Sequence, residues 1–287
     1  LYGIRDFYSR YGFAVAFPAS RVATVPVYHA RHAVTGKGYS WRPLDSADMG
    51  AVVELYMDVC FKRTGARARR AGEFQRFGKG SGWNTLPDPW GLFRGGRLAA
   101  YAVLDRDARA VRVAEAAARS YRAGMALIGK LAAEAVRRAA SEIHLFLPPD
   151  DELCVWCRKF GGEVRLGLEA DGGPMARIIS LPAFIDAVGE VLIERAGAGW
   201  KAEFDTGGES VLAEAGCAGV KTTPAGSARR ADAVIRCSPG ALAQLFFGYR
   251  PLDEMVFAGE VKIAGNKNLA AGFFHTEYAH MMMPDYF

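Results

Sequence analysis

Two cysteines, Cys154 and Cys157, have the spacing that zinc binding or thiol–disulfide exchange can use. A structural zinc site normally takes four ligands, so it needs a second close pair. The sequence has none, because the other cysteines are dispersed: Cys60, Cys217 and Cys237. The aromatic neighbours Trp156 and Phe160 indicate a buried helix instead, and we interpret the pair as structural.

The histidines His275 and His280, with Glu277 between them, form a second candidate site. Both rings could lie near one face of a helix, as metal ligands do. Helical ligands on adjacent turns are three or four residues apart, however, and these histidines are five apart. We therefore predict no metal site, and expect the histidines near an interface or an active-site tail.

An aromatic–X–X–basic–aromatic–glycine element occurs twice, at residues 7–13 (FYSRYGF) and 156–162 (WCRKFGG). Each copy precedes an alternating, strand-like segment. Glycine is common just beyond a helix end because it reaches left-handed backbone angles without steric cost, so any helix-to-strand turn can look like this. The position of the second copy, late in residues 39–180, favours a repeated domain. The first copy would then be the tail of a domain whose front is absent.

The last seven residues (MMMPDYF) are strongly apolar and aromatic. Chain ends are usually frayed. A solvated end of this composition is rare, so we expect it to dock on the folded protein.

Bulk composition restricts the functional class. The composition, 51% hydrophobic and 23% charged, is ordinary for a globular protein, and the net charge of +5 is modest. The length of 287 residues suggests about two domains. A short basic run, Arg67, Arg69 and Arg70, is interpreted as a solvated loop rather than a nucleic-acid patch.

No apolar run reaches the length of a membrane span and no signal peptide is visible, so we expect a cytoplasmic protein. The first residue is Leu1, from which we expect a truncated chain.

Sequence periodicity predicts an α+β fold in three parts: residues 1–30, 38–180 and 181–287. The first part holds two strands, near residues 11–17 and 21–28. Two strands alone are marginal in water, so we expect them to belong to a sheet whose other strands are missing. The second part combines strands with helices near 49–57, 121–140 and 153–160, and ends with a strand near 177–181. After Pro182 short strands and helices indicate a separate α+β domain.

With these elements in place, residues 242–250 (LAQLFFGYR) and 257–265 (FAGEVKIAG) carry a family resemblance together with residues 7–13. The chain resembles the enhanced-intracellular-survival N-acetyltransferases of the GNAT superfamily. The resemblance implies that residues 1–30 are the remnant of a catalytic GNAT domain. Residues 38–180 would be a degenerate second GNAT-like domain, and residues 181–287 a sterol-carrier-protein-like domain.

The resemblance also implies acetyl transfer from acetyl-CoA to an amine. Tyr8 matches the tyrosine that protonates the departing thiolate, and Phe287 would supply the main-chain carboxylate that deprotonates the amine. Asp285 and Tyr286 are candidates for binding the cationic acceptor, a small molecule or a peptide lysine. A homo-oligomer, a hexamer in this family, is expected, without nucleic-acid or membrane partners.

The second copy of the repeat departs from this pattern, because Cys157 stands where Tyr8 stands in the first. Residues 121–126 (YRAGMA) are the best match to a pyrophosphate-binding segment at a helix start. Gly124 and Ala126 fit, whereas Tyr121 replaces a basic or amide residue. We therefore predict that the middle domain is not catalytic and that the main coenzyme-binding loop lies outside the chain.

A competing hypothesis is a non-catalytic scaffold or lipid-binding protein that uses the sterol-carrier-like domain. Its apolar tunnel would be lined by Leu245, Phe246 and Met255. A packed core is the default expectation for these residues.

Overall fold

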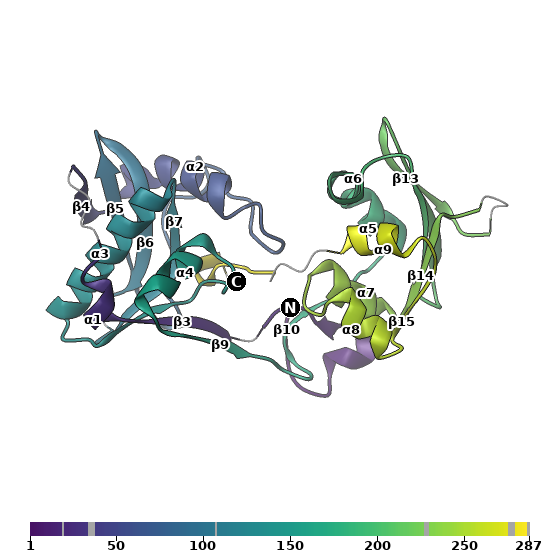
Figure 1. Cartoon of the computed structure of the whole chain (residues 1–287), viewed down its shortest axis with the longest axis horizontal. Coiled ribbons are helices and arrows are strands. Elements are labelled where there is room, and N and C mark those ends of the chain that lie inside the picture. The colour runs from purple at the N-terminus through teal and green to yellow at the C-terminus, as the bar shows by residue number, and fades with distance from the viewer. Residues whose placement is uncertain (19, 34–37, 107, 227–229, 275–278, 286–287) are drawn as a thin grey trace. The chain divides into compact units, whose positions relative to one another are not determined.

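The computed structural model describes residues 1–18, 20–33, 38–106, 108–226, 230–274 and 279–285. The chain forms two compact units. We call residues 1–19 with 169–277 unit 1, and residues 20–168 with 278–287 unit 2 (Figure 1). Each unit combines sheet and helix, which confirms the predicted α+β class.

Unit 2 is built on a seven-stranded sheet of order β4-β5-β6-β7-β8-β3-β9. Neighbouring strands are antiparallel except β7 and β8, which are parallel. The strands are β3 (Ser20–Pro26), β4 (Ser40–Pro43), β5 (Pro87–Arg94), β6 (Arg97–Asp105), β7 (Val111–Ala118), β8 (Glu142–Leu145) and β9 (Glu163–Gly167).

The helices of unit 2 begin at side chains that suit helix starts. Asp45 and Asp48 form a capping box at η2 (Ser46–Asp48), which leads into α2 (Met49–Val59). Ser120 caps α3 (Tyr121–Arg137), the helix that connects the parallel strands β7 and β8 and packs against both. The remaining helical segments are α1 (Val27–Ala30), α4 (Glu152–Cys157), η3 (Arg158–Phe160) and η4 (Met283–Asp285).

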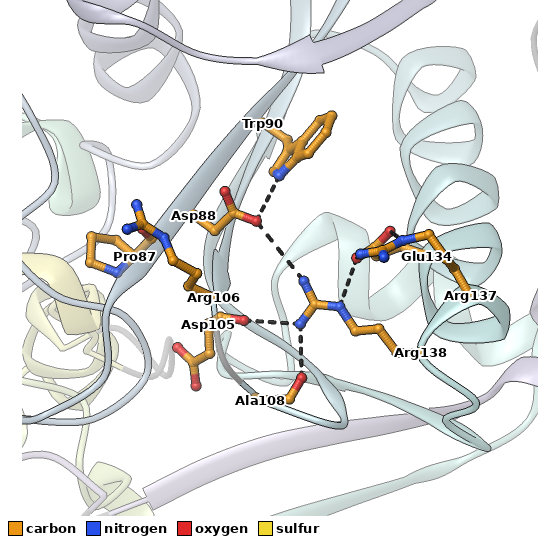
Figure 2. A network of polar contacts seen from close by, with 9 residues as sticks. All are labelled: Pro87, Asp88, Trp90, Asp105, Arg106, Ala108, Glu134, Arg137 and Arg138. Atoms are coloured by element: carbon orange, nitrogen blue, oxygen red, sulfur yellow. Dashed lines mark hydrogen bonds and ion pairs between the residues drawn. The ribbon is translucent and has the colours of Figure 1, made fainter.

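Arg138, directly after α3, ties the end of this helix to β5, to the end of β6 and to Ala108 (Figure 2). Its Nε donates to Glu134 at 2.7 Å, and its Nη1 donates to the backbone carbonyls of Asp105 and Ala108, each at 3.0 Å. Asp88 lies 3.9 Å from Nη2 and also accepts a hydrogen bond from the Trp90 indole. The Arg138 side chain is 9% exposed, so these bonds replace water that the site largely excludes.

Unit 1 contains two sheets. A three-stranded sheet has the order β1-β10-β2, from β1 (Tyr2–Gly3), β10 (Gly173–Ala176) and β2 (Ala14–Val15). A five-stranded sheet has the order β13-β12-β11-β14-β15. Its strands are β11 (Lys201–Asp205), β12 (Ser210–Gly216), β13 (Gly219–Pro224), β14 (Ala233–Cys237) and β15 (Val261–Gly265).

The helices of unit 1 enclose a separate apolar core. They are η1 (Tyr8–Tyr11), α5 (Leu181–Ala187), α6 (Gly189–Ala196), α7 (Pro239–Phe246), α8 (Leu252–Phe257) and α9 (Lys267–Phe273). The predicted tunnel-lining residues Leu245, Phe246 and Met255 are all buried in this core. They pack within this core, in agreement with the expectation of a packed core.

Two predictions about strands are wrong. The strand over residues 21–28 does not lack partners, because β3 pairs with β8 and β9 of this same chain. The strand near residues 177–181 lies earlier, at β10, and Leu181 already begins α5. Pro182 fits the first turn of a helix, where a missing N–H costs nothing. The strand prediction rested on the apolar composition of residues 177–181 and did not take this helix start into account.

The compact units also differ from the three predicted segments. Residues 20–33 and 279–285 belong to unit 2, and β10 belongs to unit 1. Among the described residues, no helix combines the length and apolar character that crossing a membrane requires.

The Arg138 contacts generate a prediction with a matched control. Arg138→Met should lower the free energy of unfolding by about 1–3 kcal/mol, because two carbonyls lose their donor in a poorly solvated place. Arg137→Met should change it by less than about 0.5 kcal/mol, because the Arg137 side chain is 71% exposed and its ion pair among the described residues is with Glu134. Urea denaturation measures both, and equal effects would contradict this role for Arg138.

Candidate functional site

Tyr8 begins a tight turn in unit 1. The helix η1 ends at Gly12, whose φ of 78° lies in the left-handed region, and the Gly12 N–H donates to the Ser9 carbonyl at 3.0 Å. The Phe13 N–H donates to the Tyr8 carbonyl at 3.3 Å. This confirms the predicted role of the glycine in the first copy of the repeat.

The Tyr8 ring is held from several sides. It packs edge-on against Phe7 at 4.9 Å and Phe13 at 5.9 Å between ring centroids. A Cβ at Gly3 would come within 3.1 Å of Tyr8 Cδ2, so the ring lies close to the β1 backbone. Tyr8 is half-buried, and within the described part of the chain no residue hydrogen-bonds its hydroxyl.

The second copy of the repeat also ends a short helix at a glycine, but its backbone conformation and its chemistry differ from those of the first. Helix η3 ends at Gly161, with φ of 75°, but Cys157 in the place of Tyr8 is buried. Burial raises the pKa of the Cys157 thiol to about 12, and it raises the pKa of Cys154 as well. Both cysteines are buried on α4 without a disulfide, which favours their interpretation as structural.

The start of α3, the best sequence match to a pyrophosphate-binding segment, is covered by an aromatic side chain. A Cβ at Gly124 would lie 2.1 Å from the Trp156 ring, so the glycine is needed for the indole to approach the helix. Tyr121 packs edge-on against the same ring at 5.3 Å. The residues present here do not fit a diphosphate over Gly124, and they favour the prediction of a non-catalytic middle domain.

Arg69 corrects the prediction of a solvated basic loop, because its side chain is 1% exposed. Its two terminal nitrogens donate to Glu115 of β7 at 2.7 and 2.6 Å. Its Nε and Nη2 also donate to Asp285 at 3.1 and 2.7 Å. Glu115 accepts a further hydrogen bond from the Tyr101 hydroxyl at 2.6 Å. We call Arg69, Glu115 and Asp285 the Arg69 cluster.

Aromatic rings enclose this guanidinium. Its carbon lies 3.8 Å from the ring centroid of Tyr56, 4.5 Å from Phe74 and 5.7 Å from Phe77. Burial by itself would lower the pKa of Arg69, but the facing carboxylates outweigh burial and raise that pKa above its ordinary value. Arg69 therefore stays charged, and the cluster is held by charge-assisted hydrogen bonds in a poorly hydrated place.

The predicted substrate- and acid–base residues are only partly described. Tyr8 belongs to unit 1 and Asp285 to unit 2. The Asp285 carboxylate is already paired with Arg69, and its role in attracting an acceptor stays a prediction.

His280 is buried beside Arg21, with its Nδ1 contacting Arg21 Nη1. His275, Glu277, Tyr286 and Phe287 lie outside the described residues. Within the residues that are described, no group of three or more His, Cys, Asp or Glu could hold a metal ion.

Sequence reasoning missed the Arg69 cluster, although one signal was present. Glu115 interrupts an otherwise apolar stretch of the predicted strand, and β7 is buried on both sides of it. A charged residue inside a buried strand requires a partner of opposite charge. The identity of that partner depends on the fold, because Arg69 lies in a loop far away in sequence.

Comparison with known proteins adds the fold. No protein-family model and no curated protein matches the sequence. A structure from Enterococcus faecalis, described as a probable N-acyltransferase, is 15% identical with a TM-score of 0.71, over 99% of this chain and 70% of its own. A GCN5-related N-acetyltransferase from Kribbella flavida is 18% identical with a TM-score of 0.69, over 100% and 70%.

Eis1 from Mycobacterium abscessus is 18% identical with a TM-score of 0.59, over 98% of this chain and 72% of its own. The chain thus shares the fold of about seven-tenths of these proteins. At such identities the likeness establishes the fold, and function has to be argued from residues.

Neighbouring arginines provide a test of the Arg69 cluster. Arg69→Met should destabilise unit 2 by about 3–5 kcal/mol, because it leaves two buried carboxylates without their cation. Arg70→Met is the matched control, since Arg70 is exposed and its ion pair within the described part of the chain is with exposed Glu73, and it should cost less than about 0.5 kcal/mol. Urea denaturation gives both values. Similar costs for the two variants would argue against a buried charge pair.

Thiol labelling tests the structural interpretation of the cysteines. Iodoacetamide at pH 8 should modify the exposed Cys217 readily, whereas Cys154 and Cys157 should react only as the protein unfolds, because burial disfavours their thiolates. Mass spectrometry assigns the sites, and Cys217→Ser should remove the fast phase. Rapid labelling of Cys157 in the folded chain would show that the thiol is accessible and reactive.

Proposed function

We propose that this chain is part of an acetyl-CoA-dependent N-acetyltransferase that acts on an amine, such as a cationic small molecule or a lysine. The likeness to N-acyltransferase structures over 98–100% of the chain carries this proposal. The chain corresponds to about 70% of those proteins, and we propose that the main coenzyme-binding loop lies in the remainder. We also propose that the protein is a homo-oligomer and that it is located in the cytoplasm.

Tyr8 is the proposed general acid. In the reaction the amine nitrogen attacks the thioester carbonyl, the C–S bond breaks, and the departing thiolate takes a proton from the Tyr8 hydroxyl. The supporting observation is the held ring with a hydroxyl that no described residue engages. A phenol, with an ordinary pKa near ~10, suits protonation of a thiolate of similar basicity.

The proposed base is the main-chain carboxylate at Phe287, which removes the proton that the amine loses on attack. Tyr286 is proposed to face the acceptor, whereas Asp285 is buried and paired with Arg69 and is not proposed to contact it. Unit 2 is proposed to take no part in binding the coenzyme, and the indole over Gly124 supports this.

The experiment compares two tyrosines of the same short helix in the intact gene product. Thiol release from acetyl-CoA is followed with a polyamine or an aminoglycoside as acceptor. Tyr8→Phe should lower kcat by about 10²–10⁴-fold, the usual contribution of a general acid. Tyr11→Phe is the matched control, because Tyr11 is 54% exposed and its loss should leave kcat nearly unchanged.

A further variant tests the base, since adding one residue after Phe287 should abolish turnover while acetyl-CoA still binds. Absence of thiol release with every amine, together with saturable binding of a fluorescent fatty acid, would overturn the enzyme and favour the lipid-binding alternative. The packed positions of Leu245, Phe246 and Met255 argue against a tunnel in unit 1.

A further inference from the structure

Strand β7 loses its strand partner on one edge part-way along its length. It pairs with β8 only at residues 111–113, and the Phe146 N–H makes the last bond, to the Val113 carbonyl at 2.9 Å. On its other edge the register with β6 shifts at Ala114, so Glu115 follows an irregularity in the sheet. Even so, residues 114–118 are all buried. Something other than a strand must therefore cover this part of β7.

Residues 279–285 contribute to that cover. Helix η4 packs against β7, and Met282 and Met283 join the apolar core of unit 2. At one end of the segment the His280 N–H donates to the Thr64 carbonyl at 2.9 Å, and at the other end Asp285 binds Arg69. The segment is thus anchored by an apolar centre and a polar contact near each end.

The partner of Asp285 is oriented by groups that do not belong to this segment. Glu115 binds two nitrogens of Arg69, Tyr101 orients Glu115, and the rings of Tyr56 and Phe74 flank the guanidinium. The Arg69–Glu115 pair alone is neutral, and its Nε–H faces Asp285. A site whose donors are fixed in advance loses little entropy when a carboxylate binds.

The segment reaches this site as a separate piece of chain. Residues 169–277, which come between it and the rest of unit 2, belong to unit 1. A segment held in this way behaves as a ligand on a tether, whose occupancy depends on effective concentration as well as on affinity.

We propose that the Arg69–Glu115 pair and the open edge of β7 form a peptide-binding site. The site takes an apolar, methionine-rich segment whose last residue has an acidic side chain, and in this chain residues 279–285 occupy it. The site is specific for an acidic side chain, because the Nε and Nη2 of Arg69 both donate to the Asp285 carboxylate. It accepts the same segment in trans when its own is absent. This inference does not depend on the acetyltransferase proposal.

The test uses a fluorescein-labelled peptide with the sequence of residues 279–287 and a chain that ends at residue 278. Fluorescence anisotropy should show saturable binding to the shortened chain and none to the full chain at the same concentration, because the full chain's own segment fills the site. Asp285→Asn in the peptide should weaken binding by about tenfold or more, since it removes a charge-assisted hydrogen bond to a buried cation. Equal binding of both peptides, or no binding to a folded shortened chain, would overturn the proposal.

A second measurement needs no shortened chain. In the full chain, Asp285→Asn should speed hydrogen exchange of the amides in residues 279–285 by about tenfold or more. The amides of β11 in unit 1 serve as the reference and should not change. Unaltered exchange in residues 279–285 would show that Asp285 does not hold the segment and would refute the proposed site.

Discussion

A buried guanidinium needs neighbouring groups of opposite charge, and in unit 2 the buried guanidinium is that of Arg69. Glu115 of β7 meets this need, Tyr101 of β6 fixes Glu115, and Tyr56 of α2 lies against the charged plane. The loop that carries Arg69, two sheet strands, one helix and residues 279–285 thus converge on a single charge. Loss of Arg69 would leave two buried carboxylates without a cation.

Much of the fold could be predicted because the signals for it are local. The helix from Tyr121 and the turn at Gly12 follow from a helix cap and a left-handed glycine. Which strand pairs with which is not a local property. The prediction for β3 failed because its partners, β8 and β9, come more than a hundred residues later in the chain.

The candidate site shows the same division. Tyr8 could be singled out from a repeated motif, and the structural role of Cys157 from its aromatic neighbours. The burial of Arg69 could not be predicted, because Arg67, Arg69 and Arg70 look alike in sequence and only one of them faces a buried glutamate. The two copies of the repeat both end a short helix at a glycine with positive φ, but one carries a half-buried phenol and the other a buried thiol.

The division of the chain between units also determines the order in which unit 2 can be completed during synthesis. Its sheet, Arg69 and Glu115 all emerge from the ribosome before residue 169, whereas residues 279–285 follow only after unit 1 has been made. Until then the edge of β7 beyond Val113 lacks this cover, and a nascent unit 2 presents apolar surface and a guanidinium bound to one carboxylate instead of two. Residues 279–285 therefore complete unit 2 only after residues 169–277 of unit 1 have been made.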